Sequence, residues 1–362
     1  MKCKLGDIAI VTMGQSPKGD TYNSNGNGMP FLQGNRTFGD RYPTFDTWTT
    51  APTKIANAGD VIMSVRAPVG DLNITPVQMC LGRGVCSIRA LNGNQDFIYY
   101  LMKHSMDQLL SKESGTVFGS VNRNDINGLE VTIPDDATQL IIARYLASID
   151  DKIEANKHIN NNLDEQVSSI FQEWFEDFGR FDGICPQTWK QGVLADIASI
   201  SSGKRPPIKS AEKTDEAMIP LVGAASVMGY TSEANHTDKI LVTGRVGTHG
   251  VVQRFNTPCW TSDNTLVITS DFYEYAYQIL QRIDYHSLNR GSTQPLITQG
   301  DMNKVAILLP DKDILAEFEA LAGRLMSQYE ANIQENSKLA EIRDTLLPKL
   351  MSGELDVSDV QI

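Results

Sequence analysis

Two carboxylates and a lysine stand at a spacing that could hold a catalytic metal ion. Asp135 follows a proline, and the later run Asp150-Asp151-Lys152 places a second carboxylate two residues before a lysine. Many nucleases bring such carboxylates together on neighbouring strands, where they bind one cation that activates water. The apolar spacing around Asp150 predicts a helix instead, with Asp135 ahead of its first turn, where an acid is favourable. A structural role is therefore favoured, and a self-contained metal-dependent nuclease is the alternative.

Other catalytic signatures are missing from the sequence. It contains no phosphate-binding G-x-x-x-x-G-K-[ST] loop, no H-E-x-x-H zinc helix and no G-x-S-x-G nucleophile elbow. The five histidines lack metal-ligand spacing, and the five cysteines include no C-x-x-C pair. We therefore predict no catalytic residue, no metal site and no cofactor bound by this chain.

Cysteine usage and hydropathy indicate the compartment. An odd number of scattered cysteines fits a reducing environment better than a disulfide framework. The N-terminal run MKCKLGDIAIV is broken by Asp7 and lacks a signal-peptide core. No apolar stretch approaches the roughly 20 residues that a membrane span needs. The expected location is the cytoplasm, with no membrane partner.

The chain repeats itself. GTVFGSVNRNDINGLEVTIPD (115–135) resembles GSTQPLITQGDMNKVAILLPD (291–311), and the offset of 176 residues continues through the segments that follow. Nearer the N-terminus, LGDIAIVTMG (5–14) resembles LADIASISSG (194–203) at an offset of 189. A drifting offset indicates tolerated loop insertions, as on variable surfaces, whereas a fixed offset is typical of packed helices. The repeat predicts two copies of one unit, each a variable globular part followed by a constant helical part.

The two globular parts, 1–135 and 179–310, are predicted to be α+β domains. Short β-branched runs alternate with Gly, Pro, Asn and Asp turns. Apolar spacing typical of helices occurs at 97–110 and 273–283. The predicted strands include DVIMSVR (60–66), GVCSIRA (84–90), LEVTIP (129–134), KILVTG (239–244) and VAILLP (305–310).

The segments 136–178 and 311–353 are each predicted to be one long helix. Apolar residues recur every three or four positions, as in a heptad seam, and two asparagines interrupt both seams at matching steps. An antiparallel pair would place Asn156 opposite Asn336, and Asn160 opposite Asn332, an arrangement that penalises shifted registers. Asparagines on a solvated face are the alternative.

The residues predicted to make the contacts between the two helices come from both segments. Arg343 falls at a seam position, where we expect the neighbouring Ile342 to make the contact. Helices of about 40 residues would each span roughly 60 Å. The predicted fold class is thus α+β, with two domains separated by an antiparallel coiled coil in a pseudo-two-fold repeat. The pairing residues are Ile149, Ile153, Asn156, Asn160, Leu163, Leu325, Tyr329, Asn332, Asn336 and Leu339.

Charge is unevenly distributed along the chain. The formal net charge is −12, from 32 basic and 44 acidic residues, and the pI is near 4.9. All of this excess lies in 136–178 and in 311–362, whereas each globular part carries as many basic as acidic residues. Acidic helices suit solvent or a basic protein partner, and neutral globular parts do not exclude DNA.

Several segments together resemble the specificity subunits (HsdS type) of type I restriction–modification systems. The distal RDTLLPKLMSGEL (343–355) and the central LASIDDKIEANKHINNNLDEQVSSIFQEWF (146–175) carry the resemblance most strongly. The joins TIPD (132–135) and LLPD (308–311) and the repeated plan add to it. The resemblance covers essentially the whole chain.

The resemblance implies a function and an assembly. Two target-recognition domains would each read one half of a bipartite double-stranded DNA target, and the helices would set the spacer. Two methylation subunits that use S-adenosylmethionine would join the chain, as would restriction subunits that use ATP and Mg²⁺. The complex would have DNA adenine methyltransferase and ATP-dependent endonuclease activity, with this chain non-catalytic. A two-domain protein-binding scaffold without DNA binding is a further alternative.

The implied layout assigns every part of the chain. It comprises target-recognition domain 1 (1–135), the central spacer helix (136–178), target-recognition domain 2 (179–310), the distal spacer helix (311–353) and the C-terminal tail (354–362).

Polar and basic residues in the turn-rich loops are the candidate DNA contacts. Arginine suits guanine, and asparagine or glutamine suits adenine, whereas lysine and serine more often hold phosphate. Two of the arginines, Arg66 and Arg245, share a strand-then-arginine pattern in the two globular parts. The candidates are Gln15, Ser16, Lys18, Arg36, Arg41, Arg66 and Arg83 in the first part, and Lys204, Arg205, Lys209, Arg245, His249 and Arg254 in the second.

Overall fold

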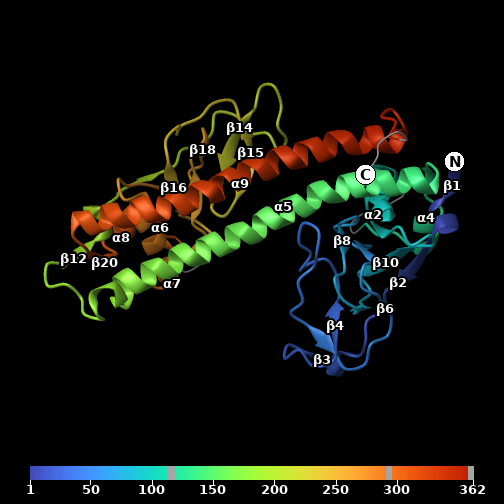
Figure 1. The fold of residues 1–362 in the computed structure, drawn as a ribbon, viewed down its shortest axis with the longest axis horizontal. Coiled ribbons are helices and arrows are strands. Elements are labelled where there is room, and N and C mark those ends of the chain that lie inside the picture. Colours follow the sequence, from blue (N-terminus) through green and yellow to red (C-terminus); the bar gives the residue numbers. More distant parts are fainter. Residues whose placement is uncertain (112–118, 291–295, 358–362) are drawn as a thin grey trace. The chain divides into compact units, whose positions relative to one another are not determined.

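The computed structural model describes residues 1–111, 119–290 and 296–357 (Figure 1). The chain forms two compact units. The first unit comprises Met1–Asn156 and Gln334–Ile362, and the second comprises Lys157–Ile333. Residues 358–362 of the predicted C-terminal tail, and the glycines that open the repeated segment at 115 and 291, lie outside the described residues. Each unit thus combines one globular part with portions of both long helices.

The first unit is built on three sheets of short strands. These strands are β1 (Lys2–Lys4), β2 (Ala9–Met13), β3 (Tyr22–Asn23), β4 (Met29–Leu32), β5 (Trp48–Thr49), β6 (Ile55–Ala56), β7 (Val61–Ser64), β8 (Leu72–Ile74), β9 (Met79–Leu81), β10 (Val85–Ala90) and β11 (Glu130–Thr132). The central sheet is antiparallel, in the order β2-β10-β7-β8. A second sheet, β3-β5-β4-β9-β6, pairs β4 with β9 in parallel, and β1 pairs with β11.

The second unit repeats this plan with fewer strands. They are β12 (Lys190–Val193), β13 (Ser199–Ser202), β14 (Ile219–Val222), β15 (Val227–Thr231), β16 (Ile240–Gly244), β17 (Gln253–Phe255), β18 (Trp260–Thr261), β19 (Thr265–Thr269) and β20 (Ala306–Leu309). The central antiparallel sheet has the order β13-β19-β16-β17. A smaller sheet, β15-β14-β18, again contains one parallel pair, β14 with β18, and β12 pairs with β20.

Short helices complete both units. They are α1 (Leu5–Ile8), η1 (Gly19–Thr21), α2 (Gln95–His104), α3 (Met106–Leu110) and α4 (Arg123–Asn127) in the first, and η3 (Gly179–Phe181), η4 (Leu194–Asp196), α6 (Tyr273–Arg282), α7 (Tyr285–Leu288) and α8 (Gln299–Asn303) in the second. The predicted helix over 97–110 is in fact two helices, since α2 ends at His104 and α3 begins at Met106, with Ser105 between them. The predicted α+β class is confirmed.

Two long helices connect the units along the chain. Helix α5 (Asp136–Phe171) is 36 residues long and continues into a π-helical turn, η2 (Gln172–Glu176); helix α9 (Lys312–Ser352) is 41 residues long. Asp135 stabilises the start of α5, because its carboxylate accepts the Thr138 backbone amide at 3.0 Å. Within the described residues, no helix is long and apolar enough to span a lipid bilayer.

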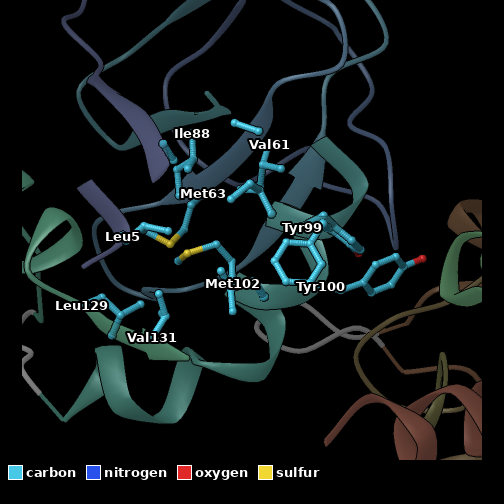
Figure 2. Close-up of a cluster of buried hydrophobic side chains, with 14 of the residues drawn as sticks. Leu5, Val61, Met63, Ile88, Tyr99, Tyr100, Met102, Leu129 and Val131 are labelled. Atoms are coloured by element: carbon cyan, nitrogen blue, oxygen red, sulfur yellow. The ribbon is translucent and has the colours of Figure 1, made fainter. Parts of the chain in front are cut away.

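The core of the first unit lies between its central sheet, α2 and the long helices (Figure 2). Leu5, Met63, Ile88 and Met102 are fully buried there. Leucine and methionine residues near the end of α9 join this core, so the C-terminal helix is part of the domain at the N-terminus. Each fully buried aliphatic side chain contributes about 1.5–3 kcal/mol.

The core of the second unit has an aromatic half. Phe171 and Phe175, from the end of α5, pack against Tyr275 of α6 and Phe318 of α9. Ring centroids within this group lie 4.9 to 6.4 Å apart, in tilted and edge-to-face arrangements. The aromatic group therefore fixes α6, α5 and α9 to one another within the second unit.

Candidate nucleic-acid interface

The first candidate loop crosses a second loop at backbone contact distance. After β2, Gly14 donates its amide to the Val85 carbonyl at 3.0 Å, and Gln15 donates to the Leu81 carbonyl at 2.9 Å. A Cβ atom at Gly14 would lie 2.0 Å from the Gly82 oxygen, so only glycine permits this approach. The crossing holds the 14–18 loop beside the turn between β9 and β10.

Three polar side chains converge at this crossing. Ser16 Oγ accepts hydrogen bonds from the backbone amide and from Nε of Arg83, both at 3.2 Å, and donates to Gln33 Oε1 at 2.9 Å. Arg83 and Gln33 are exposed. An arginine fork and a glutamine amide, both oriented by one serine, can hydrogen-bond to base edges. We name Ser16, Gln33 and Arg83 the first loop cluster.

The second unit has the same crossing with different side chains. Gly203 donates to Thr265 at 3.1 Å, and Lys204 donates to Thr261 at 2.9 Å, as Gly14 and Gln15 do in the first unit. A Cβ atom at Gly203 would lie 2.1 Å from the Ser262 oxygen. The backbone crossing is therefore common to both units.

A groove of about 480 Å³, lined by polar and apolar side chains alike, accompanies the second crossing. Its lining includes Arg205 and Lys209 from the basic loop, Asp263 and Asn264 from the turn before β19, and Met228. Gly203 donates to Thr265 as Gly14 donates to Val85, so these two acceptors are equivalent. Asp263 and Arg83 each lie two residues before the acceptor, and Asp263 therefore occupies the place of Arg83. We name Arg205, Lys209, Asp263 and Asn264 the second loop cluster.

Sequence reasoning did not find Gln33, Asp263 and Asn264. Two signals could have pointed to them. Gln33 follows a buried strand and precedes a glycine, and Asp263-Asn264 precedes a strand at the level where the first unit has Arg83-Gly84. Both positions lie in turns next to a strand, and such loop residues are typically exposed and often carry binding functions.

Three candidates of the first unit lie on the surface outside the loop cluster. Lys18 is exposed ahead of η1, and its carbonyl accepts the Thr21 amide at 3.0 Å. Arg36 is exposed and forms an ion pair with Asp46 at 2.6 Å. Arg66 is also exposed. These positions leave them able to reach a phosphate, as a solvated side chain can.

Two candidates of the second unit are half-buried. The Arg245 amide donates to the Asn264 carbonyl at 2.8 Å, just as Val65 donates to Gly84 in the first unit at 2.9 Å. The structural counterpart of Arg245 is therefore Val65, and the shared strand-then-arginine pattern is shifted by one residue. His249 lies nearby, with Nδ1 3.1 Å from the Gly244 carbonyl.

Two candidate arginines are not available to DNA, which corrects the prediction for them. Arg41 is 6% exposed and Arg254 is 7% exposed, and both are paired with carboxylates. Arg254 makes two hydrogen bonds to Glu274, at 2.6 and 2.8 Å. Folding brings each arginine against carboxylates from distant segments of the chain. The composition of a loop does not indicate such pairing, so both arginines were predicted to be exposed.

The structure brings the helix asparagines together in the expected pairs. In the first unit, Asn156 Nδ2 donates to Asn336 Oδ1 at 2.8 Å. In the second, Asn332 Nδ2 donates to Asn160 Oδ1 at 2.8 Å. Asn156, Asn160 and Asn332 are buried, which rules out the solvated-face alternative for them.

The other predicted pairing residues line the same helix faces. The Ile153 carbonyl accepts from Asn336 at 3.4 Å, and the Tyr329 carbonyl accepts from Asn160 at 3.2 Å. Leu325 and Tyr329 pack against the aromatic core of the second unit. Ile149, Leu163 and Leu339 are half-buried.

The expectation for Ile342 is wrong. Ile342 is 49% exposed, whereas Arg343 turns inward and donates from Nη1 to Asp150 at 2.6 Å. Tyr100 also donates to Asp150, at 2.6 Å. Burial, and then the Asp150 carboxylate, raise the pKa of Tyr100. Asp150 thus belongs to a buried structural network.

The pair of carboxylates considered for a metal site has no shared centre. Asp150 is engaged by Tyr100 and Arg343, and hydrogen bonds from Thr138 hold the pKa of Asp135 below its ordinary value. Across residues 1–111, 119–290 and 296–357, no group of three His, Cys, Asp or Glu side chains could hold a metal ion. These contacts give Asp135 and Asp150 structural roles within the fold.

Known proteins are similar to this chain in sequence and in fold. A family model, the type I restriction modification DNA specificity domain, matches residues 1–165 and 186–343. The MjaIX type I restriction enzyme specificity subunit of Methanocaldococcus jannaschii is 25% identical over 407 residues, covering 99% of this chain and 94% of that protein. A protein of the same organism named for the MjaX specificity subunit is 35% identical over 162 residues, which is 44% of this chain and 38% of that protein.

A solved structure has the same architecture. The S subunit of a type I restriction–modification system from M. genitalium superposes with a TM-score of 0.64 at 18% identity, covering 99% of this chain and 96% of that chain. At this identity the likeness establishes the fold.

Proposed function

Because the chain belongs to the type I restriction modification DNA specificity family, we propose that it is the non-catalytic subunit that recognises a bipartite DNA target. In this proposal residues 1–135 and 179–310 are target-recognition domains, 136–178 and 311–353 are spacer helices, and 354–362 form a tail. Each domain reads one half-site through its own loop cluster.

The observation that carries the proposal is the repeated loop crossing. Gly14 and Gly203 place their loops against equivalent turns, so the backbone that presents side chains is alike in the two units. The presented side chains differ, since Arg83 in one unit corresponds to Asp263 in the other. One scaffold with different side chains at the same place is what two different half-sites require, because arginine suits guanine and aspartate suits cytosine.

The helices suit the role of spacer. Helix α5 begins in the first unit and ends in the second, whereas α9 begins in the second unit and ends in the first. Buried amide pairs, Asn156 with Asn336 and Asn160 with Asn332, hold one register. A fixed register means a fixed number of helical residues between the recognition domains.

The assembly follows from the family and the charge. We propose that the chain binds two methylation subunits that use S-adenosylmethionine and, in the complete enzyme, restriction subunits that use ATP and Mg²⁺, in the cytoplasm. The acidic helices favour a basic protein partner over phosphates. DNA affinity of the isolated chain should be modest, because neutral domains release few counterions.

Competition binding with the assembled complex tests this proposal. The chain is assembled with the methylation subunits of its own system and offered a duplex library with two randomised half-sites. We expect enrichment of one bipartite sequence over random duplex by about 10³-fold or more. Equal recovery of all duplexes would contradict it.

A further inference from the structure

A buried arginine ties the central sheet of the second unit to its helices. Arg254, on the edge strand β17, donates to both carboxylate oxygens of Glu274 on α6, at 2.6 and 2.8 Å. It also donates to Glu330 on α9 at 3.1 Å. The guanidinium lies over the rings of Tyr273 and Tyr277, with its central carbon 4.9 and 4.7 Å from their centroids.

The first unit contains a corresponding buried arginine that faces a short and a long helix, with more exposed carboxylate partners. The Arg41 side chain is 6% exposed, and Nη1 lies 2.5 Å from Asp151 on α5 while Nη2 lies 3.6 Å from Asp96 on α2. Asp96 is the second residue of α2, which follows β10, and Glu274 is the second residue of α6, which follows β19. The strands β10 and β19 occupy the same place in the two central sheets. The Arg41 guanidinium lies over the Tyr42 ring at 5.4 Å.

The two arginines come from different segments of the chain and reach equivalent places. Arg254 pairs with Leu241 in the sheet, and the residue in that position of the first unit is Ile74, opposite Val61. The Ile74 amide donates to the Arg41 carbonyl at 2.8 Å. Arg41 is therefore brought by a loop to the edge strand where Arg254 stands in the strand itself.

We infer that Arg41 and Arg254 are positioning residues that hold each recognition sheet at a fixed angle on its spacer helix. The inference rests on the proposed function. Each guanidinium joins three elements: the sheet edge, the short helix and the long helix. A planar guanidinium that contacts carboxylates on two helices fixes orientation as well as distance, whereas an ammonium group acts as a point charge. Arg254 in addition binds Glu274 in a bidentate manner.

This role has a consequence for DNA recognition. If the sheet's angle on the helix is fixed, the two half-sites are accepted at one spacing. We call the contacts of Arg41 in the first unit, and those of Arg254 in the second, the arginine clamp of that unit. If a clamp is released, the sheet still presents its loop cluster but tilts more freely, so neighbouring spacings become acceptable. The clamp would therefore control spacer tolerance and leave base preference untouched.

The variants differ in how much they risk folding. Asp151 and Asp96 are 67% and 50% exposed, so water can solvate both carboxylates in Arg41→Met. Glu274 and Glu330 are 3% and 15% exposed, and an unpaired buried charge there is costly, so the second clamp is tested by Arg254→Lys. Arg144→Met removes an exposed arginine from α5 and is the matched control.

The experiment measures spacer selectivity and base selectivity separately. Full chains assembled with their methylation subunits are bound to duplexes that carry the parent spacer, a spacer one base pair longer or shorter, or one substituted half-site base. In Arg41→Met and Arg254→Lys, preference for the parent spacer should fall from about tenfold or more to about threefold or less. Base preference should stay within about twofold of the parent, and Arg144→Met should change neither.

The outcomes separate this inference from the function on which it rests. A parent complex without half-site preference would overturn the proposed function. A selective parent whose Arg41→Met variant folds and keeps its spacer preference would overturn the clamp. If Arg254→Lys fails to fold, Arg41→Met alone decides, because its partners can be hydrated.

Discussion

Asn160 and Asn332 face each other in the interior of the second unit, where Asn332 Nδ2 donates to Asn160 Oδ1 over 2.8 Å. They are 6% and 4% exposed, and Asn160 also donates to the Tyr329 carbonyl at 3.2 Å. Two buried amides satisfy each other only in one helix register. The pair therefore costs stability relative to an apolar contact and contributes specificity of alignment.

Removing one amide should be worse than replacing both. Asn160→Ala leaves the Asn332 amide buried without its partner, so the free energy of unfolding should fall by about 1–3 kcal/mol. The double substitution Asn160→Leu with Asn332→Leu should lie within about 1 kcal/mol of the parent or above it. Urea unfolding followed by circular dichroism measures both, with the exposed Asn161→Ala as control. Additive effects of the two positions would contradict a coupled pair.

Loss of the Asp150 carboxylate should destabilise the first unit. In Asp150→Ala the Arg343 guanidinium, 16% exposed, loses its buried partner, and Tyr100 loses its acceptor. We expect a loss of about 3–5 kcal/mol, and about 1 kcal/mol for Asp135→Ala, which removes a helix cap. Thermal unfolding of the two variants side by side checks the ranking. Metal-dependent DNA cleavage by the parent chain, abolished in Asp150→Ala, would support the nuclease alternative instead.

Glu319 should make the second unit less stable as the pH rises. Its carboxylate accepts the Glu274 and Tyr275 amides at 3.0 and 2.8 Å, yet burial raises the pKa of Glu319 to about 7 from an ordinary 4.5. The folded state therefore binds the proton more tightly than the unfolded state. Its stabilising effect is complete below pH 4.5 and is lost as pH rises through 7.

The matched variant isolates this effect. Glu319→Gln removes the titration, so its unfolding free energy relative to the parent should rise between pH 5 and pH 8 by an amount on the order of 2 kcal/mol. Urea midpoints at the two pH values measure the difference. An equal pH dependence in parent and variant would show that Glu319 does not titrate in this range.

Arg83 should contribute to base preference. Ser16 orients its guanidinium, and a good bidentate contact with guanine discriminates by about 1–3 kcal/mol. Arg83→Ala in the assembled complex should lose that preference at one position of one half-site, whereas Lys18→Ala should weaken all sequences alike. Competition with single-base-substituted duplexes measures both. A uniform loss in Arg83→Ala would assign it to phosphate.

Periodicity predicted much of this fold. The strands at 60–66, 84–90 and 239–244 and both long helices lie where apolar spacing put them, because burial on one face or both imposes that spacing. The same pattern misassigned Ile342, since a heptad count does not register that Arg343 finds a buried carboxylate on the facing helix.

The loop residues were predicted less well. Arg41 and Arg254 have the composition of DNA contacts, and their engagement by Asp151 and Glu274 depends on chain segments brought together only by folding. Arg66 and Arg245 differ by one residue in register, so they do not occupy equivalent places in the turns that follow their strands. The spacing of apolar residues thus predicts where helices and strands lie. Which loop side chains stay exposed depends instead on ion pairs between segments that are distant in the sequence.

The most direct measurement is a map of methylated adenines in the genome of a host that carries the complete system. We expect methylation confined to one bipartite sequence, with two defined half-sites and a spacer of constant length. Methylation without a shared motif, or at half-sites separated by varied spacings, would contradict the claim that two recognition domains are held in register by a helix pair.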